Sequence, residues 1–335
     1  MKFARLALAL MLSISFFNQT FAAPQKTPVT PPSTLAVTPS GVALGFTLTP
    51  IITGIPVVNN GWGIDGAVSA VAAKNGDIVV TSFNDDVVRV YSNSDTANGS
   101  RLKSTTTIVG IHYAQLANLN GAIYARVNQS TSTPTSGSLV QLNDNGTLAR
   151  TVASNIPSGF PLVAAPCLNS LFFGSNSAGG FYVITAPNGG APYNSLNPSP
   201  AFYQISTDPI GGTFNMYFDC CSKSVYAEYA SNLGRFSLAG MTLTQNLGLY
   251  IEGGPYDGSA YGIGKIGGTS TLYGNFIINN RHDAIILDPE TNVRTTILSG
   301  GNYDGHAVSP YPDGSLLLTS GNTVYKLRCT NCSFL

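Results

Sequence analysis

The stretch Asn75-Gly-Asp-Ile-Val-Val-Thr-Ser82, with Val87-Val-Arg-Val-Tyr91 just after it, decides the fold. Both runs are short and rich in β-branched residues, and turn-forming residues bound them, so each is typical of a β-strand. The same turn and apolar strand recur along the chain, and the copies begin at Gly76, Gly121, Ser170, Ser224, Ser270 and Gly314. Their spacing averages about 48 residues, which indicates a repeat architecture.

Each copy continues with further predicted strands. A polar turn that carries an asparagine, such as Asn84 or Asn322, leads into a third strand, as at 87–91, 138–142, 284–287 and 323–327. Thr-rich fourth strands follow in the first five copies, for example at 104–109 and 293–298. Four short strands at this period are typical of a propeller blade. We therefore predict an all-β, six-bladed β-propeller with four-stranded blades.

The two ends of the repeat array predict how the ring closes. The sixth copy runs out at Cys329 without a fourth strand, and an unassigned strand at 46–52 lies before the first copy. Joining both chain ends in one blade would remove the open sheet edges, so we expect the last blade to be closed by the N-terminal strand. An open solenoid of six copies is the alternative.

The composition excludes several classes of protein. Only 10% of the residues are charged, with 16 basic and 16 acidic side chains, so a basic nucleic-acid binder is excluded. A 43% share of hydrophobic residues, including 16 Phe and 16 Tyr, is enough to bury a large core and excludes disorder. The 36 Gly and 20 Pro disfavour long helices, so the composition agrees with a β-rich fold.

The N-terminus predicts export. Lys2 and Arg5 precede an apolar run from 6 to 17, and small residues lead to a cleavage site after Ala22, so residues 1–22 are predicted to be a secretory signal peptide. The Pro/Thr-rich residues 23–42 are predicted to be a linker, and 43–335 the propeller. No later run is long enough to span a bilayer, so we expect a secreted protein, extracellular or periplasmic, without a membrane span in its mature form.

Five cysteines agree with an oxidising compartment. The pair Cys329 and Cys332 predicts a small disulfide loop that fastens the tail, and a zinc half-site or free thiols are the alternatives. Cys167 and the vicinal Cys220 and Cys221 stand at comparable places in blades 3 and 4. One disulfide from Cys167 to Cys220 or Cys221 is therefore expected between these blades.

One motif is rejected on its context. Gly262-Ile-Gly-Lys-Ile-Gly267 matches the phosphate-binding pattern G-x-G-x-x-G, but Thr-Ser-Thr-Leu-Tyr follows where a helix would have to begin.

The first and last copies carry a family resemblance. Gly63-Ile-Asp-Gly-Ala-Val68 in the first copy, and Asp304-Gly-His-Ala-Val-Ser309 with Pro312-Asp-Gly-Ser-Leu-Leu-Leu318 in the last, resemble blades of the six-bladed gluconolactonase-like, NHL and virginiamycin-B-lyase-like propellers. The likeness covers about 290 residues as architecture, and blades 1, 5 and 6 match at the level of motifs.

Asp-Gly pairs open the first strand of three blades, at Asp65, Asp257 and Asp304. These blades are neighbours once the ring closes, so the carboxylates should converge at one rim of the channel, with His112, His306, Asn84 and Asn322 as further rim residues. Oxygen ligands without a thiolate suit Ca²⁺ or Mg²⁺. The alternative is turn chemistry, in which Asp caps the chain reversal and Gly supplies a positive φ.

The resemblance adds roles to these residues. Gluconolactonase-like propellers hold a divalent cation with a Glu, an Asn and an Asp, which would place Asp65, Asp257 and Asp304 on the cation and make Asp304 the base. Asp304-Gly-His306 is loosely similar to the Glu-x-His of the virginiamycin-lyase-like enzymes, so His306 is the other candidate proton carrier.

Two functions follow from the sequence. The first is an extracellular binding or scaffold protein that holds an unidentified ligand or protein at the channel rim or its loops. The second is a lactonase or lyase assisted by a divalent cation.

Overall fold

The computed structural model describes residues 35–59, 64–127, 137–157, 159, 161–174, 180–187, 202–206, 216–229, 232–238, 243–247, 262–280, 282–301 and 306–335. All of them belong to one compact unit, Pro32–Leu335. The predicted signal peptide, residues 1–22, and the first part of the predicted linker lie outside the described residues. No helix in the described ranges is long and apolar enough to cross a membrane.

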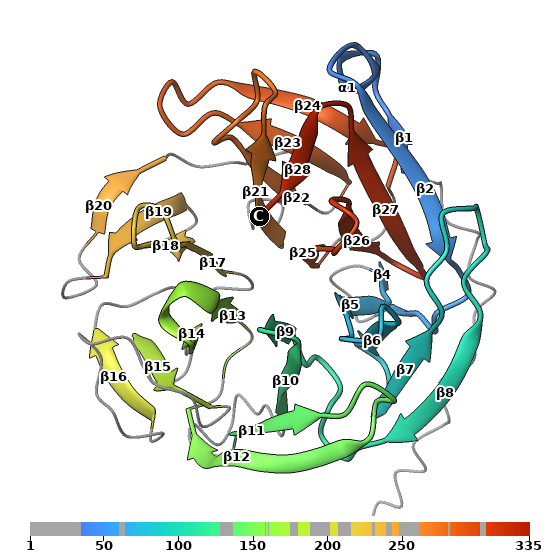
Figure 1. Ribbon diagram of the computed structural model, residues 1–335, viewed down its shortest axis with the longest axis vertical. Coiled ribbons are helices and arrows are strands. Elements are labelled where there is room, and N and C mark those ends of the chain that lie inside the picture. Colours follow the sequence, from blue (N-terminus) through green and yellow to red (C-terminus); the bar gives the residue numbers. More distant parts are fainter. Residues whose placement is uncertain are drawn as a thin grey trace, which may run out of the picture. The chain divides into compact units, whose positions relative to one another are not determined.

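The described unit is a six-bladed β-propeller, as predicted (Figure 1). In each blade the strands are antiparallel, and the first strand lies nearest the channel. The strands of blades 1 to 3 are β5 (Ala67–Ala72), β6 (Ile78–Ser82), β7 (Val87–Tyr91) and β8 (Leu102–Thr107); β9 (Leu116–Leu119), β10 (Ala122–Val127), β11 (Gly137–Leu142) and β12 (Leu148–Ile156); and β13 (Leu162–Ala165), β14 (Ser170–Gly174), β15 (Phe181–Thr185) and β16 (Phe202–Ser206). A short 3-10 helix, Pro166–Leu168, joins β13 to β14.

Blades 4 to 6 repeat this order. Their strands are β17 (Met216–Asp219), β18 (Ser224–Tyr229), β19 (Asn232–Ser237) and β20 (Leu243–Asn246); β21 (Gly262–Gly268), β22 (Phe276–Asn279), β23 (Asp283–Leu287) and β24 (Arg294–Ser299); and β25 (Val308–Pro310), β26 (Leu316–Ser320), β27 (Thr323–Cys329) and β2 (Phe46–Ile52). Small strands β1 (Ala36–Val37), β3 (Val58–Asn59), β4 (Ile64–Asp65) and β28 (Cys332–Phe334) and helix α1 (Pro39–Ala43) complete the described elements.

The predicted closure by the N-terminal strand is confirmed. β2 pairs with β27 in register Thr47↔Arg328 and Leu48↔Leu327, so a strand from the N-terminal part of the chain completes blade 6. Ile51 and Ile52 of β2 are buried in an apolar cluster that also contains Val80 of blade 1 and Leu317 of blade 6. The last blade is thus joined to the first by packing as well as by hydrogen bonds.

Two expectations differ from the structure. Residues 270–274, predicted as the second strand of blade 5, form a turn in which Ser270 Oγ accepts a hydrogen bond from Leu272 N (3.2 Å), and the strand is β22 instead. Residues 35–42, assigned to the linker, contain β1 and the start of α1, and β1 pairs with β24. Helix α1 begins because Thr38 Oγ1 accepts a hydrogen bond from Gly41 N (3.0 Å).

The glycine-rich β21 allows close approach of its neighbours. A Cβ added to Gly262 would lie 2.8 Å from Val308 N of blade 6, and one added to Gly267 would lie 2.8 Å from Leu335 Cγ. The G-x-G-x-x-G match therefore marks tight packing along a strand, and its rejection as a phosphate-binding loop is confirmed.

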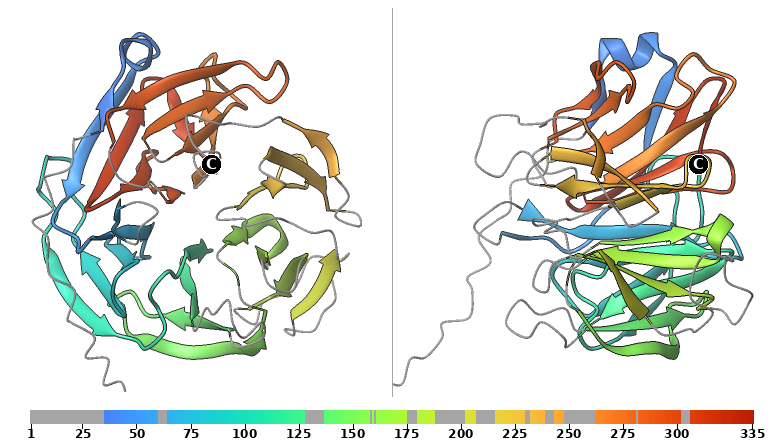
Figure 2. Two further views of the ribbon diagram at one scale, coloured as in Figure 1. Left: turned by 180° about the vertical axis from the view of Figure 1, so that it is seen from behind. Right: turned by 90° about the vertical axis from the view of Figure 1, so that its left-hand side faces the viewer.

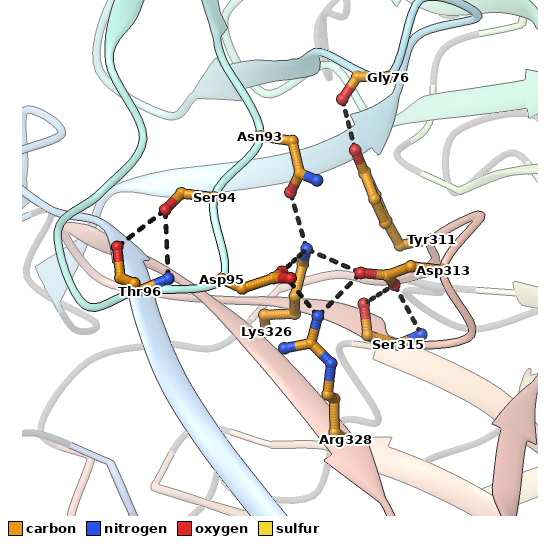
Figure 3. A network of polar contacts seen from close by, with 10 residues as sticks. All are labelled: Gly76, Asn93, Ser94, Asp95, Thr96, Tyr311, Asp313, Ser315, Lys326 and Arg328. Atoms are coloured by element: carbon orange, nitrogen blue, oxygen red, sulfur yellow. Dashed lines mark hydrogen bonds and ion pairs between the residues drawn. The ribbon is translucent and has the colours of Figure 1, made fainter.

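A polar network ties blade 6 to blade 1 on the outside of the ring closure (Figure 3). The ammonium of Lys326, fully buried on β27, donates to Asn93 Oδ1 (2.7 Å) and Asp95 Oδ1 (2.8 Å) in the loop after β7, and to Asp313 Oδ2 (3.0 Å) in the turn before β26. Arg328 Nη2 donates to the same two carboxylates. Burial alone would raise the pKa of Asp313, but hydrogen bonds from Ser315 and Lys326 outweigh it and lower that pKa to about 2.

Candidate functional site

The upper end of the channel, defined as the end where the inner strands begin, contains the predicted rim residues that the structure describes. The backbone N of Phe83, just after β6, donates to Gly66 O, just before β5, at 2.8 Å. The loop after a second strand therefore returns to the start of a first strand, as expected for a propeller.

Asp65 and His306 form a buried pair at this end. His306 Nε2 lies 2.7 Å from Asp65 Oδ1. His306 is 8% exposed and Asp65 is 1% exposed. Asp65 precedes β5 of blade 1 and His306 precedes β25 of blade 6, so the pair crosses the junction where the ring closes. The sequence placed both residues at the rim, and only the structure joins them. Asp257 and Asp304, the other two predicted ligands, lie outside the described residues.

Aromatic rings lie beside this pair. The Phe83 ring is 3.5 Å from that of Tyr113 and 6.3 Å from that of His306, centroid to centroid. Tyr113 has a φ of 64°, which is uncommon for a residue with a Cβ and occurs more often at functional sites. Burial and the nearby Asp65 carboxylate raise the pKa of Tyr113 to about 12. The phenol is therefore neutral at physiological pH.

The remaining predicted rim residues have local partners. His112 Nδ1 lies 2.5 Å from Asp86 Oδ1, and both side chains are partly exposed. Asn84 is exposed and its Nδ2 donates to Val57 O (3.3 Å), while Asn322 Oδ1 accepts from Thr323 Oγ1 (2.8 Å). Asn84 lies in the β6–β7 turn of blade 1, His112 in the connection from β8 to β9, and Asn322 in the β26–β27 turn of blade 6.

The metal prediction rests on one described ligand. Asp65 is almost fully buried and its Oδ1 is engaged by His306. Within the described part of the chain, no three His, Cys, Asp or Glu side chains lie close enough to share a metal ion. The donors that the structure shows therefore do not make a site for Ca²⁺ or Mg²⁺.

A cavity of about 590 Å³ occupies the central channel. All six inner strands contribute to its lining, which is mainly apolar; representative residues are Val71, Leu116, Val163, Met216, Ile263 and Val308. The loops that join first to second strands also line it, through Asn120, Pro166, Cys221 and Pro312. These loops lie at the lower end of the channel, opposite the Asp65–His306 pair. The sequence-based prediction placed the ligand at the channel rim or its loops and missed this cavity, because the sequences of short inner strands look the same whether or not the strands leave space between them.

Asp219 is the one charged side chain among the described residues that line this cavity. Lys265 Nζ donates to Asp219 Oδ2 at 2.8 Å, and Ser222 Oγ donates to the same oxygen at 2.7 Å. Burial would raise the pKa of Asp219, but these hydrogen bonds outweigh it, and the pKa is lowered. The carboxylate is therefore ionised and paired, and the cavity offers little net charge to a ligand.

The cysteines pair as expected. Cys167 and Cys220 form a disulfide between blades 3 and 4, with their Cα atoms 5.9 Å apart, and Cys329 is bonded to Cys332. Cys221 is free, exposed and part of the cavity lining. The two disulfides are consistent with an oxidising compartment.

Comparisons with known proteins support the fold. No protein-family model matches the chain, and no curated protein matches its sequence. Among solved structures, a gluconolactonase from Xanthomonas campestris is 8% identical, with a TM-score of 0.56 over 90% of this chain and 96% of that one. A glucose dehydrogenase is 10% identical, with a TM-score of 0.57 over 85% and 100%. An auxiliary nutrient binding protein from Bacteroides thetaiotaomicron VPI-5482 is 10% identical, with a TM-score of 0.54 over 84% and 76%.

These similarities define a class of protein. The chain is a six-bladed β-propeller whose architecture is shared with a lactonase, a dehydrogenase and a nutrient-binding protein. At identities this low the likeness shows the fold alone, so function has to be argued from the site.

Proposed function

We propose that this protein is an exported binding protein that takes up a small, uncharged and largely apolar organic molecule in its central channel. The observation that supports this most is the cavity of about 590 Å³. Its volume lies in the range of small-molecule sites, and apolar walls with a few polar groups are the usual construction of such sites.

The polar groups of the lining favour an uncharged ligand. Asp219 is paired with Lys265, so an ionic ligand would find no unpaired charged side chain on the described walls. Ser69, Gln115 and Asn118 also line the cavity and add amide and hydroxyl groups that can orient a polar end of the molecule. Burial of the apolar part would supply most of the affinity.

Export is supported by the sequence and by the disulfides. Residues 1–22 carry the pattern of a secretory signal, and the Cys167–Cys220 bond is of the kind that persists outside the reducing cytosol. A propeller that shares this fold is named an auxiliary nutrient binding protein, which agrees with a binding role.

Ser309→Trp tests the channel directly. Ser309 lines the cavity from β25, so an indole there should fill part of the space and weaken binding of the neutral fluorescent probe N-phenyl-1-naphthylamine at least about tenfold. Fluorescence titration measures this, with thermal melting as the check on folding. The matched control is Val109→Trp, because Val109 is 77% exposed and outside the lining. Equal affinities of the two folded variants would contradict binding in the channel.

A second function, catalysis at the upper end, is supported by the Asp65–His306 pair. A carboxylate 2.7 Å from an imidazole orients the ring, and an oriented imidazole is what general acid–base catalysis needs. The reaction would be ring opening of a lactone or elimination. In the version that the resemblance implies, a divalent cation is bound by Asp65 with Asp257 and Asp304.

Asp65→Asn separates this second function from the first. If the pair moves a proton, the substitution should lower turnover of glucono-δ-lactone by about a hundredfold or more, while the hydrogen bond to His306 is kept. A pH-stat assay measures the turnover of both proteins. Repeating it after EDTA treatment and after Ca²⁺ readdition shows whether turnover depends on the cation. The control is His282→Gln, because His282 lies in blade 5 with Nδ1 on Gly301 O. Absence of turnover in the wild-type protein would leave the pair as a structural link between blades 6 and 1.

A further inference from the structure

The C-terminal segment adds a strand on the channel side of blade 5. β28 pairs with β21 in register Ile266↔Phe334, Gly267↔Ser333 and Gly268↔Cys332. β21 is the inner strand of its blade, so β28 lies between that blade and the channel axis, and Figure 1 shows the C-terminus beside β21 at the centre of the ring. Leu335 N then donates to Lys265 O at 3.0 Å.

This extra strand narrows the channel at its lower end. Neighbouring strands are about 4.8 Å apart, so β28 takes up roughly that width of the channel next to blade 5. Leu335 lines the cavity together with Pro312 and Cys221 of the lower loops. Gly267 leaves the space in which the Leu335 side chain lies. The segment therefore lies where a molecule would pass to reach the cavity from below.

The attachment of this segment is short. Only three residues of β28 pair with β21, and of their side chains Phe334 is buried in an apolar core cluster against which Cys332 packs. A strand of this length is marginal without further support. The Cys329–Cys332 disulfide supplies it, because it closes the turn between β27 and β28 and restricts the open conformations of the segment.

We propose that residues 329–335 form a gate at the lower end of the channel, and that the Cys329–Cys332 disulfide keeps this gate closed. The gate controls the same ligand site as the proposed function and rests on it. Two thiol groups of a reductant lose two electrons and two protons and become a disulfide, while the Cys329–Cys332 bond breaks and each sulfur becomes a thiol. Reduction then lets β28 leave β21 more often and speeds both entry and exit of the ligand.

The first test is kinetic and uses the full chain with N-phenyl-1-naphthylamine in a stopped-flow fluorimeter. In Cys329→Ser/Cys332→Ser we expect the association and dissociation rate constants of the probe to rise together by about tenfold. Kd should change little, because the gate opens only transiently and Leu335 lies in the cavity wall for most of the time. The matched control is Cys167→Ser, which removes the other disulfide, keeps Cys220 in the cavity wall and leaves β28 fastened. Dithiothreitol added to this control should reproduce the faster rates, since only the Cys329–Cys332 bond remains to be reduced.

The second test needs no ligand. Hydrogen–deuterium exchange in the peptide that covers 329–335 should become faster in Cys329→Ser/Cys332→Ser and stay slow in the control variant. Unchanged exchange would overturn the gate. Faster exchange with probe kinetics equal in all three proteins would also overturn it, while leaving binding in the channel intact. If the probe binds none of the proteins, the proposed function fails, and the gate fails with it.

Discussion

Arg126→Ala is expected to lower the free energy of unfolding by about 4 kcal/mol, the largest loss that we predict for a single residue. Arg126 lies on β10 and is 1% exposed. Its guanidinium donates to Gly174 O (2.9 Å), to Pro161 O (3.2 Å) and to Pro157 O. The substitution would leave these buried carbonyls without that donor and would also open a cavity beside Phe173, whose ring lies 4.8 Å from the guanidinium carbon.

The position of Arg126 in its blade explains why the loss should be large. Thr81 on β6 and Asn279 on β22 occupy the corresponding strands of blades 1 and 5, and each donates to a carbonyl just before the next inner strand, Ala114 O or Ala307 O. Arg126 likewise donates to Pro161 O, which lies just before β13. It therefore connects blade 2 to blade 3.

The buried charge of Arg126 also destabilises the folded state. No carboxylate among the described residues pairs with it, its Nε has no acceptor, and burial lowers its pKa to about 9. Arg126→Met keeps much of the volume and removes the charge, so its loss should be about half that of the alanine variant. Urea unfolding measures both, with the exposed Arg101→Ala as the control. A methionine variant as stable as the wild type would show that the carbonyl hydrogen bonds add nothing to the net stability.

Lys326→Ala is expected to cost about 3 kcal/mol, the second largest effect. The ammonium is fully buried and donates to Asn93, Asp95 and Asp313, so its removal deprives two carboxylates of their shared cation (Figure 3). Figure 2 shows the ring from behind and from the side, with the red strands of blade 6 and the blue β2 next to the strands of blade 1. Arg328 compensates in part, since it contacts both carboxylates from a more exposed place. Because the network joins blade 6 to blade 1, its loss should weaken the contact between the two blades that close the ring.

Lys103→Ala is the matched control for this prediction. Lys103 Nζ is 2.5 Å from Asp77 Oδ2, but its side chain is half exposed, so water replaces most of the interaction and the loss should stay below about 1 kcal/mol. Thermal and urea unfolding of the two variants give the comparison. Equal losses of unfolding free energy in the Lys326 and Lys103 variants would contradict the view that burial decides how much an ion pair contributes to stability.

Much of the fold could be predicted from the sequence because its signals are local. A strand and its turn are encoded within a few residues, and six copies at a regular spacing average out the error in any one of them. The copy at Ser270 was placed wrongly, since Leu272 and Tyr273 resemble a strand while Ser270 closes a turn with its own hydroxyl. The six copies of the repeat still predicted the correct number of blades. The unassigned strand 46–52 and the missing fourth strand after Cys329 predicted the closure in the same way.

The candidate site was predicted less completely because its parts are far apart in the chain. Asp65 and His306 are 241 residues apart, and the sequence could place them on neighbouring blades without showing that they pair. The acidic partners of Lys326 lie on two different blades, and nothing next to Lys326 in the sequence signals its burial. The channel cavity depends on the distances between six inner strands, which no single strand encodes.

The sequence by itself determined the number of blades and the strand that closes the ring, because these follow from local strand and turn preferences repeated along the chain. The tertiary structure alone decided that Arg126 and Lys326 are buried, that Asp65 meets His306, and that β28 lies inside the ring. These features depend on the packing of one blade against the next, where burial and close approach set the energy of each contact.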